Sequence, residues 1–127
     1  MATTNDIERK FNELDWKEIS ISETLSESFI ERFQDKVDWE ALSYHQKLSE
    51  SFMEKFQNEV YWDIISQKQI MSESFIENFE RNVNWKMICR HQTLSELFII
   101  KFLDRMDWPS ILKNQTISEA FKKKFIT

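Results

Sequence analysis

The sequence repeats every 23 residues, and no other feature limits the folds open to the chain as strongly. The phrase LSESF begins at Leu25 and again at Leu48, and variants of it begin at Met71, Leu94 and Ile117. A fixed period of this length is typical of repeat proteins, in which each unit buries its apolar side against its neighbours. We therefore expect one short structural unit to be built several times along the chain.

The spacing of apolar residues inside one repeat is that of helices. Phe52 and Phe56 are four residues apart, so they fall on one face of a helix. Trp62 and Ile65 are three apart and share a face of a second helix. The sequence has no glycine and one proline, which removes the usual residues of tight hairpins. The aromatic columns are tryptophan at 16, 39, 62, 85 and 108, and phenylalanine at 29, 52, 75, 98 and 121 and at 33, 56, 79, 102 and 125.

Polar residues mark where these helices begin. Ser49 precedes the first helix of its unit, and its hydroxyl can accept a hydrogen bond from a free backbone N–H group. Asp38, Asn84 and Asp107 stand directly before tryptophans, and we expect them to cap the second helix of their units. Pro109 then falls in a first helical turn, where proline is tolerated.

We predict an all-α solenoid of about five two-helix repeats, forming a single domain over residues 1–127. Helices of about two turns are unstable alone in water, so each must pack against the next unit. The first unit is a degenerate half-repeat, because two residues separate Phe11 from Leu14 where later units have three. The last segment should form a C-terminal capping helix. The approximate units are residues 1–24, 25–47, 48–70, 71–93 and 94–116, with the cap at 117–127.

Charge and composition narrow the classes of function. The net charge of −5 argues against nonspecific nucleic-acid binding, which needs a basic face. Cys89 is the single cysteine, so it cannot form an internal disulfide and suits a reducing compartment. The first residues lack the apolar segment of a signal peptide, and no run approaches the roughly 20 apolar residues of a membrane span. We expect a cytoplasmic protein that does not bind membranes.

The stretch LSESFIERFQDKVDWEALSYHQ, at residues 25–46, combines LSE, F-x-x-x-F and DW elements at fixed spacing. It resembles the tandem 23-residue helical repeats found in proteins of large DNA viruses and some phages. The resemblance covers nearly the whole chain, from about Phe11 onward. It implies a viral or mobile-element source. It implies no shared activity, so no residue receives a function from it.

Histidine and cysteine are the residues here best suited to metal binding or catalysis. His45 and His91 occupy one repeat position and could form a metal pair or an acid–base group. Their place late in a helix, where a cation suits the dipole, favours a structural explanation. Cys89 stands where other units have Ser43 and Ser66, and packing explains it better than nucleophilic catalysis. Without known catalytic motifs, we expect no catalytic residue, no metal site and no cofactor.

Two polar columns admit both structural and functional explanations. Glutamate recurs at 27, 50, 73, 96 and 119, either as a partner of the helix dipole or as a mimic of DNA phosphates. Glutamine recurs at 46, 69, 92 and 115, at the end of each second helix. Its amide can bond loop backbone in a chain without glycine caps, or form a polar ladder for a ligand. We prefer the structural explanation for both columns.

The unit at residues 94–116 departs from the others on its outer face. Its residues 97, 100 and 103 are apolar, where the unit at 48–70 has serine, glutamate and glutamine. This stripe is either a contact surface or a region that the last helix covers. We expect a surface that contacts a protein partner. The residues of this apolar stripe are Leu97, Ile100, Leu103, Ala120 and Ile126.

The favoured function is a noncatalytic protein-interaction module, an adaptor or inhibitor of viral or phage type that acts on a host protein. A homodimer is a further use of the same stripe. One alternative is an acidic decoy that mimics DNA, although the net charge drifts from −3 in residues 1–24 to +2 in residues 117–127. A third function is binding of a small ligand in the groove of the solenoid.

Overall fold

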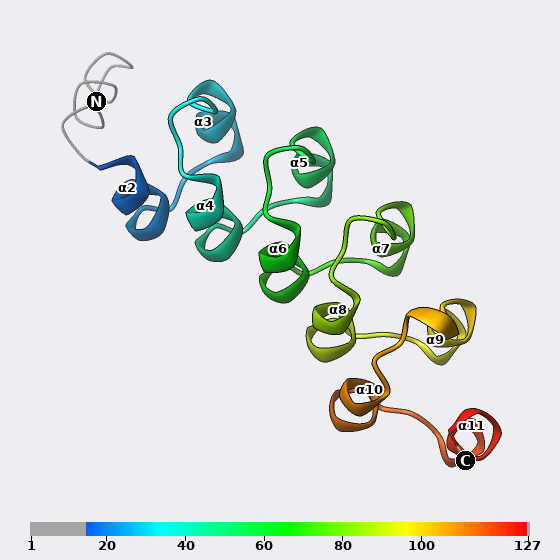
Figure 1. Ribbon diagram of the computed structural model, residues 1–127. Helices are drawn as coiled ribbons and strands as arrows, with labels where there is room; N and C mark the ends of the chain where they lie inside the picture. The colour runs from blue at the N-terminus through cyan, green and yellow to red at the C-terminus, as the bar shows by residue number, and fades with distance from the viewer. Residues whose placement is uncertain (1–14, 127) are drawn as a thin grey trace. The chain divides into compact units, whose positions relative to one another are not determined.

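The computed structural model describes residues 15–126, and all regular structure in this range is helical (Figure 1). Helices of seven and six residues alternate from α2 to α9, and α10 and α11 have seven residues each. The predicted all-α repeat fold is therefore confirmed. The helices are α2 Trp16–Ser22, α3 Glu27–Arg32, α4 Trp39–His45, α5 Glu50–Lys55, α6 Trp62–Lys68, α7 Glu73–Asn78, α8 Trp85–His91, α9 Glu96–Lys101, the 3-10 helix η1 Leu103–Arg105, α10 Trp108–Asn114 and α11 Glu119–Phe125.

The predicted caps stand at the helix starts. Ser49 precedes α5, and its Oγ accepts a hydrogen bond from the backbone N–H of Phe52 at 3.2 Å. The same serine cap recurs before α3, α7, α9 and α11. Asp38, Asn84 and Asp107 each accept a backbone N–H bond at the start of a tryptophan helix. These caps satisfy N–H groups that a short helix cannot pair internally.

The chain divides into two compact units, Met1–Ile64 and Ile65–Thr127. In the first unit α2 packs against α4, and in the second α8 packs against α10. These four helices all begin at a tryptophan, so packing between successive tryptophan helices occurs within both units. The residues expected to form the degenerate first half-repeat, up to Leu14, lie outside the described range.

Within each of the two compact units, tryptophan joins one repeat to the next. The Trp39 ring on α4 lies 6.1 Å from the Phe52 ring and 5.2 Å from the Phe56 ring of α5. Its indole N–H donates to the Gln34 carbonyl at 3.0 Å, which leaves the polar atom satisfied. Trp85 packs in the same way against the two phenylalanines of α9. The aromatic column is thus an interface between repeats.

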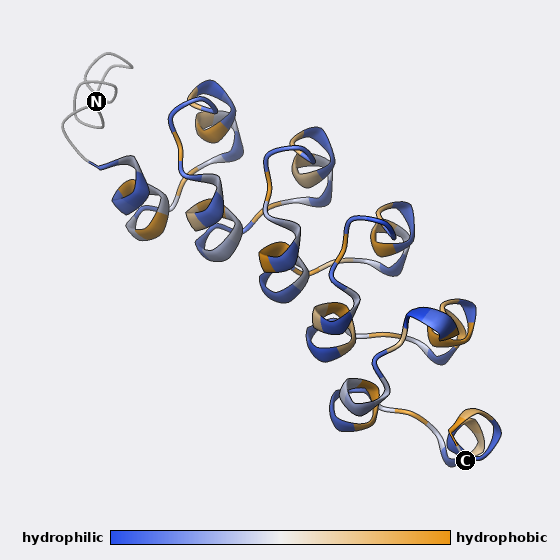
Figure 2. Ribbon diagram, in the orientation of Figure 1, coloured by the Kyte–Doolittle hydropathy of each residue, from blue (hydrophilic) through white to orange (hydrophobic). Residues whose placement is uncertain are grey.

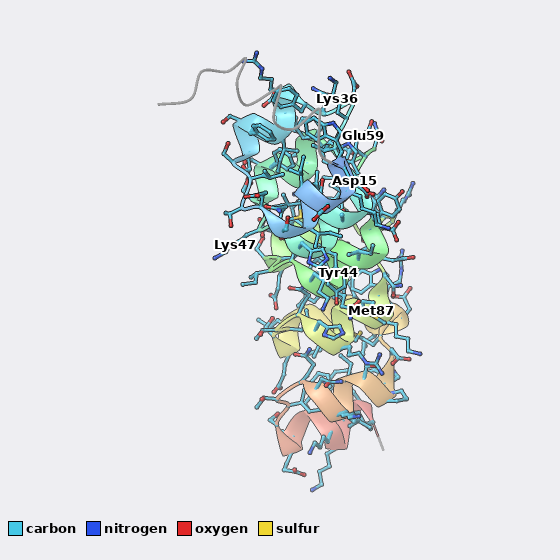
Figure 3. All side chains as sticks on the ribbon, turned by 90° about the vertical axis from the view of Figure 1, so that its left-hand side faces the viewer. Asp15, Lys36, Tyr44, Lys47, Glu59 and Met87 are labelled. Atoms are coloured by element: carbon cyan, nitrogen blue, oxygen red, sulfur yellow. The ribbon has the colours of Figure 1, made fainter. Side chains whose placement is uncertain are left out.

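Buried aliphatic residues, one from each α-helix from α2 to α10, complete the core between the helices. Ile19 on α2 and Leu42 on α4 are buried, as are Ile30 on α3 and Met53 on α5. Figure 2 shows apolar segments recurring in successive helices, with polar segments between them. Charged side chains such as Lys47 extend away from the helices (Figure 3). Each of these short helices has one apolar face that must be buried and one polar face open to solvent, so it is stable only when neighbouring helices cover the apolar face.

The tryptophan column generates the first testable prediction. We expect Trp39→Ala to lower the free energy of unfolding by about 3–5 kcal/mol, because it removes a large buried ring from an interface between repeats. Trp16→Ala should have a smaller effect, because the Trp16 ring is half-buried and lies farther from its two phenylalanine partners. Chemical denaturation followed by circular dichroism measures both. Equal losses at the two sites would contradict this account.

Candidate functional site

The glutamine column is a structural link between repeats. Gln92 follows α8 and is buried, and its amide nitrogen donates to the carbonyls of Ser66 at 3.0 Å and Gln69 at 2.6 Å. Its amide oxygen accepts the backbone N–H of Met71 at 3.0 Å. Gln46 and Gln115 make the corresponding three bonds in their own surroundings. The structural explanation is confirmed for these residues, and no amide donor is left for a ligand.

The glutamate column has a role that the sequence did not reveal. Glu73 lies in the first turn of α7, as expected for a partner of the helix dipole. Its two carboxylate oxygens also accept from the backbone N–H and the hydroxyl of Ser95, 22 residues later. Glu27 and Glu96 bind the next cap serine in the same way. The common spacing of 22 residues was the only available signal in the sequence.

Cys89 takes the place of a bridging serine. In the first unit, the Ser43 hydroxyl donates to the carbonyl of Trp39 and accepts the backbone N–H of Tyr61. Cys89 is fully buried at the corresponding position, and its thiol lies 3.7 Å from the sulfur of Met106. Burial raises the pKa of the Cys89 thiol above its ordinary value. A buried, protonated thiol fits the predicted packing role.

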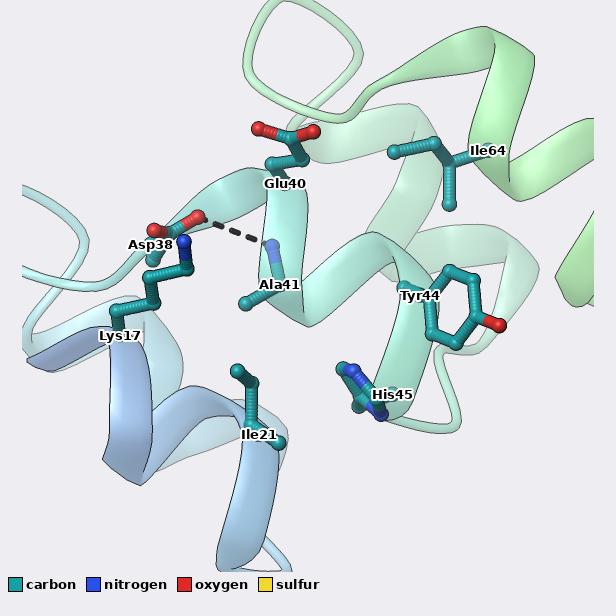
Figure 4. Close-up of a pocket in the computed structure, with 8 residues that line it drawn as sticks. All are labelled: Lys17, Ile21, Asp38, Glu40, Ala41, Tyr44, His45 and Ile64. Atoms are coloured by element: carbon teal, nitrogen blue, oxygen red, sulfur yellow. Dashed lines mark hydrogen bonds between the residues drawn. The ribbon is translucent and has the colours of Figure 1, made fainter.

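His45 lines a small hollow between α2 and α4 in the first unit (Figure 4). The hollow has a volume of about 200 Å³, and its walls include Ile21, Tyr44 and Glu40. The imidazole lies 4.6 Å from the Tyr44 ring. His91 is exposed at the end of α8. The residues that line this hollow vary from repeat to repeat, so the repeat pattern did not predict it.

A second hollow lies between α8 and α10 and is strongly basic. It has a volume of about 230 Å³, and Lys86, Arg90 and Lys113 line it. The acidic residue that lines it is Asp107, which caps α10. We name it the α8–α10 groove. The sequence analysis did not identify its three cations. A signal was available at one repeat position, which changes from apolar or neutral residues to basic ones along the chain: Ile21, Tyr44, Gln67, Arg90 and Lys113.

The apolar stripe is partly open to solvent. Leu97 is 80% exposed and Ile100 is 38% exposed, so the last helix does not cover them. Ala120 is also exposed, whereas Leu103 and Ile126 are half-buried. Helix α9 ends at Lys101, and Leu103 begins η1. The most accessible part of the stripe is therefore on α9, at Leu97 and Ile100.

No group of three or more histidine, cysteine, aspartate or glutamate side chains within residues 15–126 could hold a metal ion. In the same part of the chain, no helix has the length and apolar character needed to span a membrane. Comparison with protein-family models, with characterised proteins and with solved structures finds no match.

The glutamine column leads to a stability prediction. We expect Gln92→Leu to lower the free energy of unfolding by about 3 kcal/mol, because the buried Met71 N–H and the carbonyls of Ser66 and Gln69 lose their partner. Thr93→Ala, at the exposed neighbouring position, should change it by less than about 0.5 kcal/mol. Urea denaturation of both variants tests this. A near-neutral Gln92→Leu would show that the amide bonds contribute little.

The buried thiol leads to a prediction about reactivity. We expect iodoacetamide at mildly alkaline pH to leave Cys89 of the folded protein unmodified, because its raised pKa keeps the thiol protonated and burial blocks access. Denaturant should restore the reaction. Cys89→Ser should change the free energy of unfolding by no more than about 1 kcal/mol, since Ser43 and Ser66 hold the same position. Rapid native alkylation, followed by mass spectrometry, would contradict the packing role.

Proposed function

We propose that this chain is a noncatalytic protein-interaction module that binds a protein partner through the exposed part of its apolar stripe. The observation that supports the proposal is the exposure of Leu97 and Ile100, which lie one turn apart on α9. Neighbouring apolar side chains open to solvent are typical of contact surfaces when they form a patch. Figure 2 shows the apolar colouring of α9.

The repeat itself shows that the fold does not need apolar residues there. At the position of Leu97, α7 has Ser74, and at the position of Ile100 it has Glu77. Glu77 forms an ion pair with Lys101 of α9. Polar side chains are therefore compatible with the same helix and the same packing. The apolar residues of α9 are an addition to the repeat, and partner binding gives them a role.

The energy available from this surface suits a reversible interaction. Burying Leu97 and Ile100 completely would contribute roughly 1.5–3 kcal/mol for each side chain. The loss of rotational and translational freedom on association offsets part of this gain. Together the two side chains contribute about 3–6 kcal/mol, which is less than the roughly 8 kcal/mol of a micromolar complex, so contacts around them must supply the rest.

The partner is a host protein in the host cytoplasm, as the resemblance to viral repeat proteins suggests. A second copy of the chain is the simplest additional occupant, because a twofold arrangement buries one patch against itself. The acidic decoy is the second candidate function. It is favoured by the first compact unit, residues 1–64, which carries 15 acidic and 7 basic residues.

Replacing the exposed anchors by the repeat's own residues tests the proposed function. We expect Leu97→Ser with Ile100→Glu to remain helical, because the new carboxylate stands 24 residues before Lys124, the spacing of the Glu77–Lys101 pair. The variant should lose at least tenfold in affinity for a protein partner, or its dimer, because the buried apolar area is gone. Light scattering measures the dimer, and a photo-crosslinking residue at the exposed position 104, four residues after Ile100, captures a partner in direct contact with either the original chain or the variant.

The matched control is Leu112→Ser, which removes another exposed apolar side chain and introduces the residue found at position 43. It should leave binding unchanged. A folded double variant that keeps its dimer and its crosslinked partner would overturn the proposal. Release of the partner by salt alone, with no effect of the double variant, would favour the acidic decoy.

A further inference from the structure

The α8–α10 groove concentrates positive charge around one hollow. Lys86 and Arg90 stand four residues apart on α8, so they share a face of that helix. Lys113 reaches the same hollow from α10, which packs directly against α8. The three cationic side chains therefore come from two adjacent helices and converge on a space of about 230 Å³.

The charges of this groove are not balanced within residues 15–126. Lys86, Arg90 and Lys113 form no ion pair with any described carboxylate, whereas Lys101 pairs with Glu77 and Lys122 with Glu119. The carboxylate that lines the groove belongs to Asp107. It already accepts the backbone N–H and the hydroxyl of Ser110 at the start of α10. The groove is therefore lined by three cations without ion-pair partners and by one carboxylate that is already hydrogen-bonded, which leaves its lining with an excess of positive charge.

The fold does not require these cations. The corresponding hollow of the first unit, between α2 and α4, has Ile21 and Tyr44 where the α8–α10 groove has Arg90 and Lys113. Both pairs of helices pack with the same cap residue at the second helix, Asp38 in one unit and Asp107 in the other. Lys17 lines the first hollow at the repeat position of Lys86, so Arg90 and Lys113 are the two cations that distinguish the α8–α10 groove.

We propose that the α8–α10 groove binds a phosphate group. The hollow is smaller than the roughly 300–1,000 Å³ pockets that hold drug-sized ligands, so it suits one compact group. A phosphate monoester carries a charge of about −1.5 to −2 and three strongly accepting oxygens. Arg90 can donate to two of them in its planar fork, while Lys86 and Lys113 add charge and further donors. A carboxylate has one charge and two oxygens and matches the groove less well.

Bound phosphate would also relieve a repulsion. Like charges four residues apart on a helix destabilise it, and Lys86 and Arg90 are such a pair. An anion between them converts the repulsion into attraction, so binding should raise the melting temperature of the protein. This site is separate from the apolar stripe, whose exposed residues lie on α9. The phosphate can come from a phosphorylated side chain of a protein or from a small phosphate ester.

The test is an NMR titration of the ¹⁵N-labelled full chain with three probes at constant ionic strength. The probes are inorganic phosphate, a phosphoserine hexapeptide and its unphosphorylated counterpart. We expect saturable shifts of backbone amides in α8 and α10 with inorganic phosphate and with the phosphoserine peptide, and none with the unphosphorylated peptide. Tighter binding of the phosphopeptide than of phosphate identifies a protein source, and equal binding identifies a small phosphate ester. Absence of saturable shifts with both phosphorylated probes would overturn the proposal.

Two variants localise the site with residues that the repeat already uses. Arg90→Gln introduces the side chain of Gln67, and Lys86→Asp introduces that of Asp63. Each should weaken phosphate binding by about tenfold or more, because Arg90→Gln removes the charged planar fork and Lys86→Asp places a carboxylate beside the anion. The control is Lys47→Thr, which removes one exposed charge outside the groove and matches Thr24 and Thr93. It should bind phosphate like the original chain.

Circular dichroism of each variant establishes that the helices are intact. A phosphate affinity that is the same in Arg90→Gln, Lys86→Asp and Lys47→Thr would overturn the site, even if the chain binds phosphate. Should a groove variant fail to fold, Lys113→Gln replaces it, since glutamine occupies this repeat position at residue 67. Added potassium chloride should also weaken binding to the original chain, because the attraction is electrostatic.

Discussion

The repeat array depends on the hydrogen bonds that a buried glutamine, placed just after a tryptophan helix, makes with the backbone. Gln92 donates to two carbonyls of the preceding repeat and accepts the N–H of Met71 at the start of its own repeat, and Gln46 makes the same three bonds in the first unit. These backbone groups lie at a helix end and in a loop, where no helical partner exists. A chain without glycine lacks the usual left-handed cap, and a neighbouring side chain replaces it.

The other contacts between repeats act together with this bond. Trp39 packs on two phenylalanines of the next repeat, and Glu27 accepts from the next cap serine, Ser49. Among the described residues, no buried side-chain nitrogen or oxygen atom lacks a hydrogen-bond partner. Helices of six or seven residues gain their stability from such contacts and not from helix propensity. The residues that recur in every repeat therefore stabilise the fold.

Function is consequently expected at positions where the repeats differ. Leu97 and Ile100 replace polar residues on α9, and Arg90 and Lys113 replace Ile21 and Tyr44 at one position of the tryptophan helices. Neither change disturbs the glutamine bonds or the aromatic interfaces. A repeat protein can thus acquire a binding surface by substitution at exposed positions while its interior stays the same.

The sequence alone determined the helical class, the two-helix repeat, the serine and aspartate caps and the backbone role of glutamine, because these follow from spacing and local hydrogen bonding. It also located the apolar stripe, since Leu97 and Ile100 break the repeat pattern. Only the tertiary structure paired Glu73 with Ser95 and brought Lys113 to the hollow that Lys86 and Arg90 line. These residues are more than 20 positions apart, and their proximity depends on how neighbouring repeats stack, which local spacing does not specify.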